Sequence, residues 1–310
     1  MQSVLSAPHL HSEEAAFAYV EARLWANGRV CPHCGVVDNS GALKGKTTRA
    51  GLYKCYACRK PFTVRMGTIF ESSHVKLNVW LQAIYLLCSS KKGISTRQLQ
   101  RTFGGSLKTA WFLGHRIREA MRSGELAPIG GAGGIVEIDE TYIGRKEGVE
   151  VRQGAWHKNA VLTLVERKGA ARSFHVETAT KEEIVPIVRE NVARETHVMT
   201  DEASRYSKVG KEFSGHGVVD HSRAEYGYTD RMTGLKININ TVEGYYSIFK
   251  RGMIGIYQHC GEQHLHRYLA EFDFRYSNRI KLGVDDIARS DRALLGVKGK
   301  RLTYETTVQS

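Results

Sequence analysis

Three acidic residues stand near the ends of predicted strands or in the first turn of a predicted helix. Asp139 lies in the strand-like stretch "GIVEIDETYIG", Asp201 ends the stretch "THVMTD", and Glu243 lies one turn into the helix-like stretch "INTVEGYYSIFKR". Mg²⁺ takes carboxylate oxygens as ligands, and because it keeps several waters, two or three carboxylates suffice. Two such ions about 4 Å apart activate an attacking oxygen and stabilise a leaving oxygen in phosphoryl transfer. The pattern therefore predicts a site for Mg²⁺ (or Mn²⁺) that acts on phosphodiesters.

Each of these acids also has a purely structural interpretation. Asn240 is placed to cap the predicted helix, and Glu243, three residues later, would then complete a capping box. Asp139 is equally typical of a turn after a strand, and Asp201 is typical of a helix N-cap. The joint occurrence of the three acids on these elements favours the metal site.

Other candidates lie close to the acids in the sequence. His221, in "VVDHSRAEYG", is a fourth catalytic candidate. Side chains alternate along a strand, so Glu137 shares a strand face with Asp139 and is interpreted as a support behind the metal ligands. By the same alternation, Glu140 points to the other side.

Four cysteines form two matched pairs, in "CPHCG" and "CYAC". Cys31, Cys34, Cys55 and Cys58 have the spacing C-x2-C-x20-C-x2-C, which is typical of four thiolates around a tetrahedral Zn²⁺. A redox dithiol is the competing interpretation, but two matched pairs on a basic segment favour zinc. The sequence therefore predicts a zinc ribbon.

The net charge of +13 is unevenly distributed. Residues 1–30 carry −1, residues 31–130 carry +12 and residues 131–310 carry +2. A basic module joined to a near-neutral one indicates a polyanion-binding part and a separate working part. Attachment to ribosomes or to a membrane surface would give a similar charge.

Two predicted helices after the ribbon, in "ISTRQLQRTFGG" and "SLKTAWFLGHRIREAM", are joined by a tight glycine turn. Ser95 and Ser106 are the expected N-caps. This arrangement indicates a helix-turn-helix, although any small helical bundle contains such turns. The residues predicted to contact DNA, here, in the ribbon and after Glu243, are Lys54, Arg59, Lys60, Lys108, Thr109, Arg116, Lys250 and Arg251.

The predicted elements of the near-neutral part run three strands, a helix, a strand ending in Asp201, and later the helix bearing Glu243. This is the ribonuclease-H-like order. The predicted fold class is multidomain α+β, with a zinc ribbon, a helical DNA-binding segment and a ribonuclease-H-like α/β catalytic domain. The predicted parts are an N-terminal helix at 1–30, the ribbon at 31–66, the helical DNA-binding segment at 67–125, a linker at 126–134, the catalytic domain at 135–280 and a tail at 281–310.

The sequence resembles bacterial insertion-sequence transposases of the DDE type, in the group with an N-terminal zinc ribbon and an ISXO-type catalytic domain. The matching stretches are "CPHCG", "YKCYACRKPFTVRMGTIFESS", "VEIDETYIG", "TDEASRY", "NTVEGYYSIFKRGMIGIYQH" and "HLHRYLAEFDFRYSNR". The resemblance implies a ribonuclease-H-like fold, a divalent metal cofactor and the ends of a mobile element as substrate. Asp139, Asp201 and Glu243 fall on the family's acidic positions, and Asn240 belongs to the same pattern. Some relatives replace the residue at the Glu243 position, so Asn240 and Glu243 are both candidates for the third residue of the site. Glu243 is the better ligand for a hard cation.

The leading hypothesis is a transposase that binds terminal repeats, cleaves DNA and joins the 3′ ends to target DNA. It would act on double-stranded DNA as a homo-oligomer assembled on that DNA, in the bacterial cytoplasm. No stretch approaches the ~20 apolar residues of a membrane span, and no secretory signal is predicted. Two alternatives stay open: a DNA-binding regulator with an inactive nuclease-like domain, and a plain metal-dependent nuclease.

Overall fold

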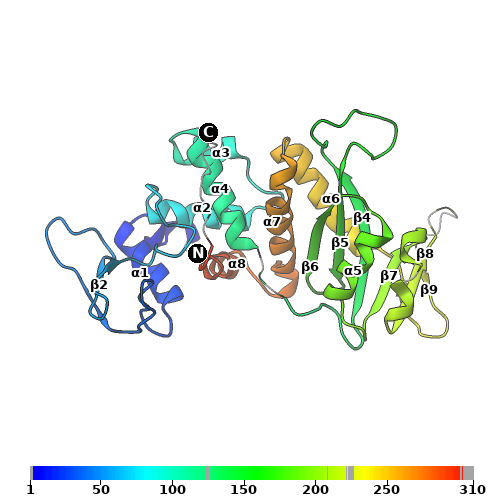
Figure 1. Ribbon diagram of the computed structural model, residues 1–310, viewed down its shortest axis with the longest axis horizontal. Coiled ribbons are helices and arrows are strands. Elements are labelled where there is room, and N and C mark those ends of the chain that lie inside the picture. The colour runs from blue at the N-terminus through cyan, green and yellow to red at the C-terminus, as the bar shows by residue number, and fades with distance from the viewer. Residues whose placement is uncertain are drawn as a thin grey trace. The chain divides into compact units, whose positions relative to one another are not determined.

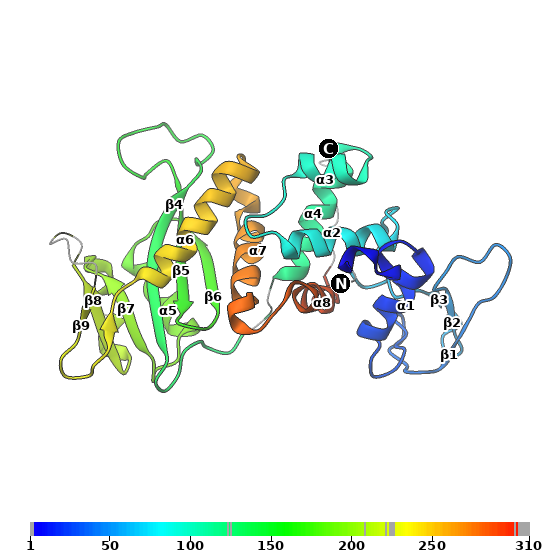
Figure 2. The ribbon, with the colours of Figure 1, turned by 180° about the vertical axis from the view of Figure 1, so that it is seen from behind.

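The computed structural model describes residues 3–122, 124, 126–207, 209–220, 222, 227–300 and 302. The chain forms two compact units, drawn in Figure 1 and from behind in Figure 2. Unit 1 contains residues 1–90, 94–122 and 285–310, and unit 2 contains residues 91–93 and 123–284. The predicted ribbon therefore lies in unit 1, and the predicted catalytic domain lies in unit 2.

A small antiparallel sheet follows the first helix of unit 1. The elements are the helix α1 (Glu13–Leu24) and the strands β1 (Ser40–Ala42), β2 (Tyr53–Cys55) and β3 (Pro61–Phe62), paired in sequence order. Strands this short bury little on their own. Cys31, Cys55 and Phe62 form the buried centre, and Trp25 and Tyr53 pack against it. The ribbon predicted from the sequence is present.

Four further helices complete unit 1, with two 3-10 turns before α1. They are α2 (Leu77–Ser89), α3 (Thr96–Phe103), α4 (Leu107–Met121) and α8 (Asp286–Leu295), and the turns are η1 (Val4–Ser6) and η2 (Pro8–Leu10). Ser95 and Ser106 cap α3 and α4 as predicted, each accepting the backbone N–H three residues later. Gly104 and Gly105 between these helices have φ of 76° and 78°, which favours glycine.

The segment 281–310, expected to be a tail, contains the helix α8 instead. This helix packs against α2 and α4. Arg289 on α8 is buried and donates to the carbonyl oxygen of Cys88 at 2.9 Å. The end of the described chain is therefore part of the core of unit 1.

A five-stranded mixed sheet forms the centre of unit 2. Its strands are β4 (Ile135–Ile143), β5 (Asn159–Glu166), β6 (Ala171–Val176), β7 (His197–Asp201) and β8 (Gly215–Val219). Their spatial order is β6-β5-β4-β7-β8. The pairs β4–β5 and β5–β6 are antiparallel, and the pairs β4–β7 and β7–β8 are parallel. The order along the chain, three strands, a helix and a strand ending in Asp201, is the ribonuclease-H-like order that the sequence predicted.

Helices cover both faces of this sheet. They are α5 (Lys181–Asn191), α6 (Asn240–Gly252), which continues as the π-helix η6 (Met253–Tyr257), and α7 (Leu265–Ser277). The smaller elements of unit 2 are η3 (Ser204–Tyr206), η4 (Val209–Glu212), β9 (Tyr228–Thr229), β10 (Lys236–Ile237), η7 (Glu262–His264) and η8 (Ile280–Leu282).

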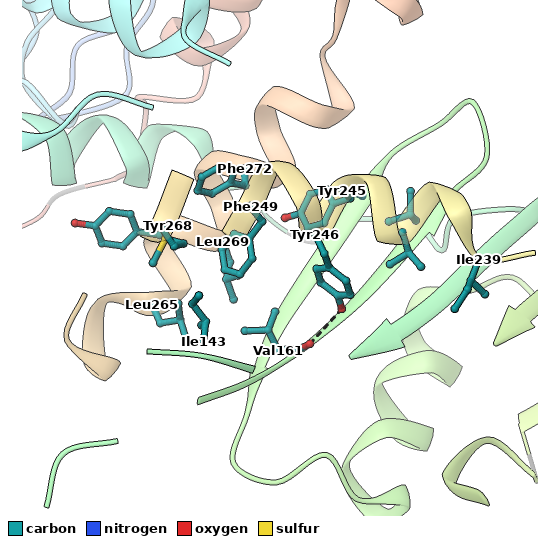
Figure 3. Close-up of a cluster of buried hydrophobic side chains, with 14 of the residues drawn as sticks. Ile143, Val161, Ile239, Tyr245, Tyr246, Phe249, Leu265, Tyr268, Leu269 and Phe272 are labelled. Atoms are coloured by element: carbon teal, nitrogen blue, oxygen red, sulfur yellow. Dashed lines mark hydrogen bonds between the residues drawn. The ribbon is translucent and has the colours of Figure 1, made fainter. Parts of the chain in front are cut away.

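Alternate residues of β4 face different helices. Ile138 packs with α5, whereas Ile143 packs with α6 and α7 in the cluster of Figure 3. Because side chains alternate with a period of two, Asp139 lies on the α6 face with Ile143. The sheet thus turns Asp139 toward the helix that bears Glu243.

Unit 2 extends into the segment predicted to be a linker. Ile129 is buried in the cluster beside α5 and forms a bridge with Val192. Its N–H donates to the carbonyl oxygen of Asn191, and its carbonyl oxygen accepts the N–H of Ala193.

Within the described ranges, no helix combines the length and hydropathy needed to cross a membrane.

Candidate active site and zinc site

The sheet register brings the two predicted aspartates to the same level. Glu137 of β4 lies opposite Met199 of β7 in a parallel pair, so Asp139 and Asp201, each two residues further along, are level. β7 ends at Asp201, whose carboxylate accepts the N–H of Ala203 at 3.1 Å. Acids on neighbouring strands at one level are placed to share a cation.

Glu140 joins the two aspartates. One oxygen from each of Asp139, Glu140 and Asp201 lies within 4.8 Å of the others. Glu140 leaves the opposite face of β4, as alternation predicts. The register of β4 with β7 ends at Glu137 and Met199, and beyond this pair the Glu140 carboxyl group lies in the same space as the two aspartates. The interpretation that set Glu140 apart from the site was wrong.

Burial and crowding raise the pKa of Asp139 to about 8. Burial is the largest cause, and the negative charges of Glu140, Asp201 and Glu243 add to it, against the N–H of Glu140 that bonds the carboxylate. A cluster of carboxylates that resists ionisation in this way is short of positive charge, which a divalent cation would supply. A donor set made only of carboxylate oxygens fits Mg²⁺ or Mn²⁺.

Glu140 is held from the side of η3. Tyr206 donates its hydroxyl to Oε2 of Glu140 at 2.5 Å, and a guanidinium nitrogen of Arg205 lies 2.8 Å from Oε1. Burial raises the pKa of Glu140, and these two partners oppose the rise. Tyr206 and Arg205 therefore hold the Glu140 carboxyl group in a fixed position.

Glu243 lies on the exposed face of α6, one turn from its start. Its charge is among the causes of the raised pKa of Asp139, so the two acids are within electrostatic reach of each other. It is not one of the three residues whose oxygens lie within 4.8 Å. The opposite face of α6 is apolar: Val242, Tyr246 and Phe249 are buried in the core cluster, in which Figure 3 labels Tyr246 and Phe249.

The capping box considered for α6 is not formed. The helix begins at Asn240, and Ile239 stands in the cap position without a side-chain cap bond. Glu137 of β4 takes the capping role, since its Oε2 accepts the N–H groups of Thr241 at 2.6 Å and Val242 at 3.0 Å. Spacing placed Glu137 on the right strand face, but nothing in the sequence around it shows these partners.

The other predicted site residues on α6 are exposed. Asn240 is exposed at the first position of the helix, and Lys250 and Arg251 are exposed in its last turn. Arg251 donates to the carbonyl oxygen of Ser247 at 2.8 Å. His221 lies outside the described residues.

The four predicted zinc ligands come together in the ribbon. All four sulfurs lie within 4.8 Å of one another. The distances from Cys31 Sγ to Cys58 Sγ and from Cys34 Sγ to Cys55 Sγ are both 3.7 Å. Sulfurs around a tetrahedral Zn²⁺, each about 2.3 Å from the ion, lie about 3.8 Å apart, whereas a disulfide holds two sulfurs at about 2.0 Å. The arrangement fits zinc.

Each cysteine pair lies on a turn that ends in left-handed backbone. The residues after the pairs, Gly35 and Arg59, have φ of 73° and 61°. The N–H groups of Cys58 and Ala57 point at the Cys55 sulfur and lower the pKa of its thiol to about 7. This favours the thiolate, which is the form that binds metal.

The residues predicted to contact DNA from unit 1 have two environments. Those that are exposed are Lys54, Arg59, Lys60, Lys108 and Thr109. Arg116 is buried, and its guanidinium donates to the carbonyl oxygens of Ile69 and Glu71 at 2.8 Å each and to that of Leu302 at 3.1 Å. Arg116 therefore holds unit 1 together, and its side chain is turned away from solvent.

Comparisons with known proteins agree with this geometry. Residues 131–277 match the family profile "ISXO2-like transposase domain", and residues 11–61 match the profile "Transposase zinc-ribbon domain". The chain is 27% identical over 282 residues to an uncharacterized protein in the transposable element ISH50 of Halobacterium salinarum, a match that covers 85% of this chain and 90% of the relative. The first profile contains Asp139, Asp201 and Glu243, and the second contains all four ribbon cysteines. The chain thus carries an ISXO2-like transposase domain preceded by a transposase zinc-ribbon domain.

Proposed function

We propose that this protein binds the terminal repeats of an insertion sequence, cleaves the DNA at the element ends and joins the 3′ ends to target DNA. One observation carries the proposal: carboxylates of Asp139, Glu140 and Asp201 meet beside the helix that bears Glu243, in a domain that matches transposases. The origin of the ISH50 relative in a transposable element supports the same function.

In this proposal Asp139, Asp201 and Glu243 hold Mg²⁺ (or Mn²⁺), and Glu140 adds negative charge beside them. The bound metal supplies Lewis acidity to the phosphodiester and to the attacking hydroxyl. The chain fixes its carboxylates before DNA arrives, because β4 and β7 place the aspartates through paired backbone. Lys250 lies two turns after Glu243 on the exposed side of α6 and orients a DNA phosphate.

DNA binding is assigned to unit 1 in the same proposal. This unit holds 21 basic and 10 acidic residues, a net charge of +11, whereas unit 2 holds 24 basic and 22 acidic, a net charge of +2. The ribbon presents Lys54, Arg59 and Lys60 to phosphates. Lys108 and Thr109 stand at the N-terminus of α4, the part of a recognition helix that contacts base edges. A homo-oligomer assembled on the DNA brings two element ends together.

The test uses the full-length protein and a labelled duplex that carries one element end. With Mg²⁺ or Mn²⁺, and not with a chelator, we expect strand cleavage at the element boundary and joining of the new 3′ end to a plasmid. Asp139→Asn should abolish both reactions while duplex binding persists. Cleavage without joining would indicate a metal-dependent nuclease. Binding without either reaction would indicate a regulator.

A further inference from the structure

Glu137 is a fully buried carboxylate just outside the acidic cluster. Its exposed fraction is 0%, and it lies on β4 two residues before Asp139, on the same strand face. Its Oε2 accepts the N–H groups of Thr241 and Val242 at 2.6 and 3.0 Å, and its Oε1 accepts the Thr241 hydroxyl at 2.7 Å. A strand carboxylate thus binds the first turn of a helix that begins more than 100 residues later.

Arg167 balances the charge of Glu137 at the same point. Its Nε lies 2.6 Å from Oε1 of Glu137. Its terminal nitrogens donate to the carbonyl oxygens of Lys236 at 2.7 Å and Asn238 at 2.8 Å, in the segment that leads into α6. Glu137 therefore has a cation and the positive end of a helix dipole as partners. A buried polar network with its bonds made in this way is rigid.

A second contact anchors α6 to the same strand one turn later. The Tyr246 hydroxyl donates to the carbonyl oxygen of Asp139 at 2.6 Å and to that of Val161 at 3.2 Å, the latter drawn in Figure 3. Glu243 lies between the two anchors along the helix. The first anchor contacts β4 at Glu137, two residues before Asp139, and the second contacts the carbonyl oxygen of Asp139 itself. Sliding α6 along β4 would break at least one of them.

We propose that Glu137 is a positioning residue of the active site: by clamping the first turn of α6 onto β4, it fixes the Glu243 carboxylate relative to Asp139 and so sets the affinity of the site for its divalent metal. The inference rests on the proposed function for the role of Glu243. Residues that orient metal ligands typically change metal affinity or activity by about 10- to 100-fold when they are replaced.

The experiment compares full-length variants by Mn²⁺ binding, followed by electron paramagnetic resonance, and by thermal unfolding. Glu137→Gln keeps the size of the side chain but removes the charge that holds the helix N-terminus. Glu137→Gln/Arg167→Gln removes both charges, so no unpaired buried charge remains. The matched control is Glu271→Gln on α7, which replaces another fully buried carboxylate, one that pairs with Arg275.

We expect both Glu137 variants to be folded and to bind Mn²⁺ about tenfold or more weakly than the wild type. Element-end cleavage should need correspondingly more metal. Glu271→Gln should lower the unfolding temperature without changing Mn²⁺ affinity. Wild-type affinity in a folded Glu137 variant would overturn the inference. Failure of both Glu137 variants to fold would overturn it too, by showing that Glu137 serves the fold as a whole.

The same measurements separate this inference from the proposed function. A wild-type protein that binds Mn²⁺ but neither cleaves nor joins element ends contradicts the transposase proposal, and the affinity comparison still decides the role of Glu137. A wild-type protein that cleaves and joins, with unchanged Mn²⁺ affinity in Glu137→Gln, contradicts only the positioning role. A wild-type protein that binds no Mn²⁺ overturns the metal site on which both depend.

Discussion

The acidic residues of unit 2 share a carboxyl group but differ in their roles, because their partners differ. Asp139 is crowded by other carboxylates, and its pKa is raised to about 8. Glu137, two residues earlier, is paired with Arg167 and with a helix N-terminus. Strand alternation in the sequence predicted that these two acids share a face. It did not predict the partners of Glu137, because those lie on α6 and in the turn after β5, away from Glu137 in the chain. Sequence spacing gives the direction of a side chain, and only the fold shows what it meets.

Glu243→Gln tests the third ligand at the scale of one residue. The start of α6 has its N–H groups bonded to Glu137, so the change should leave fold and DNA binding intact. It removes the charge of the proposed third metal ligand, so we expect cleavage of a labelled element end to fall by more than about 100-fold, the upper end for residues that only orient ligands. Mn²⁺, which is less demanding of its ligands, should restore part of the activity.

Asn240→Ala is the matched control for this change. Asn240 is exposed and is not the helix cap, so we expect its replacement to change the free energy of unfolding by no more than about 0.5 kcal/mol and to leave cleavage near the wild-type rate. The reverse result, with activity lost in Asn240→Ala and kept in Glu243→Gln, would make Asn240 the third group and would refute the ligand role of Glu243.

Elements were predicted well where their pattern is local, and less well where distant segments pack together. The order of strands and helices along unit 2 and the apolar face of α6 both follow from periodicity within each segment. The sequence did not reveal a partly buried polar link between β6, α6 and α7, in which Asp273 accepts the N–H of Ser173 at 2.7 Å and the hydroxyl of Tyr245 at 2.6 Å. Within its own helix, Asp273 interrupts an apolar stripe, and its partners belong to other elements.

The pH dependence of stability tests this link. Burial raises the pKa of Asp273 from 3.8 to about 6, and the bonds from Tyr245 and Ser173 oppose the rise. The folded state thus favours the neutral acid, so the stabilising contribution of Asp273 is complete below its unfolded pKa and is lost as pH rises through 6. We expect the free energy of unfolding of the wild type, relative to Asp273→Asn, to decrease by about 2 kcal/mol between pH 4.5 and pH 7.5.

This comparison is made by chemical denaturation of both proteins at each pH. Only the difference between them isolates Asp273, because His197 and His216, whose pKa values burial lowers, also titrate in this range. A difference that does not vary with pH would mean that Asp273 is ionised in the folded protein at both ends of the range.

The ribbon is the element whose fold should depend on metal. Its buried centre is Cys31, Cys55 and Phe62, too little to stabilise three short strands without an ion. We expect one zinc per chain by elemental analysis and its loss in Cys55→Ser, with weaker binding to element ends and unchanged Mn²⁺ affinity in unit 2. Cys88→Ser, which alters a buried cysteine outside the cluster, should keep its zinc. Wild-type protein that contains no zinc when purified without chelator would contradict the assignment.

At the scale of the whole molecule, charge divides the chain more clearly than its linear order does. The sequence located an excess of +12 in residues 31–130. The structural unit that contains most of this segment also includes α1 and α8, and α8 packs on α2 from the other end of the chain. Charge could be counted from the sequence, but the boundaries of the unit could not, because they depend on contacts such as that of Arg289 with Cys88, 201 positions apart. A fragment limited to residues 31–130 would lack part of its own core.

The division of labour is therefore best tested in the full-length chain. Replacing Lys54, Arg59 and Lys60 of the ribbon by glutamine removes three exposed positive charges from unit 1. If each contacts a phosphate, the slope of log K against log salt for duplex binding should become less steep by about 0.9 per contact, roughly 3 in total. The matched control replaces Lys168, Lys211 and Lys236, three exposed lysines of unit 2, and removes the same net charge. We expect that control to change the slope by less than about 0.9, the value for one phosphate contact. Equal slopes for the two triple variants would show that binding follows the overall charge of the protein, and that unit 1 holds no dedicated DNA surface.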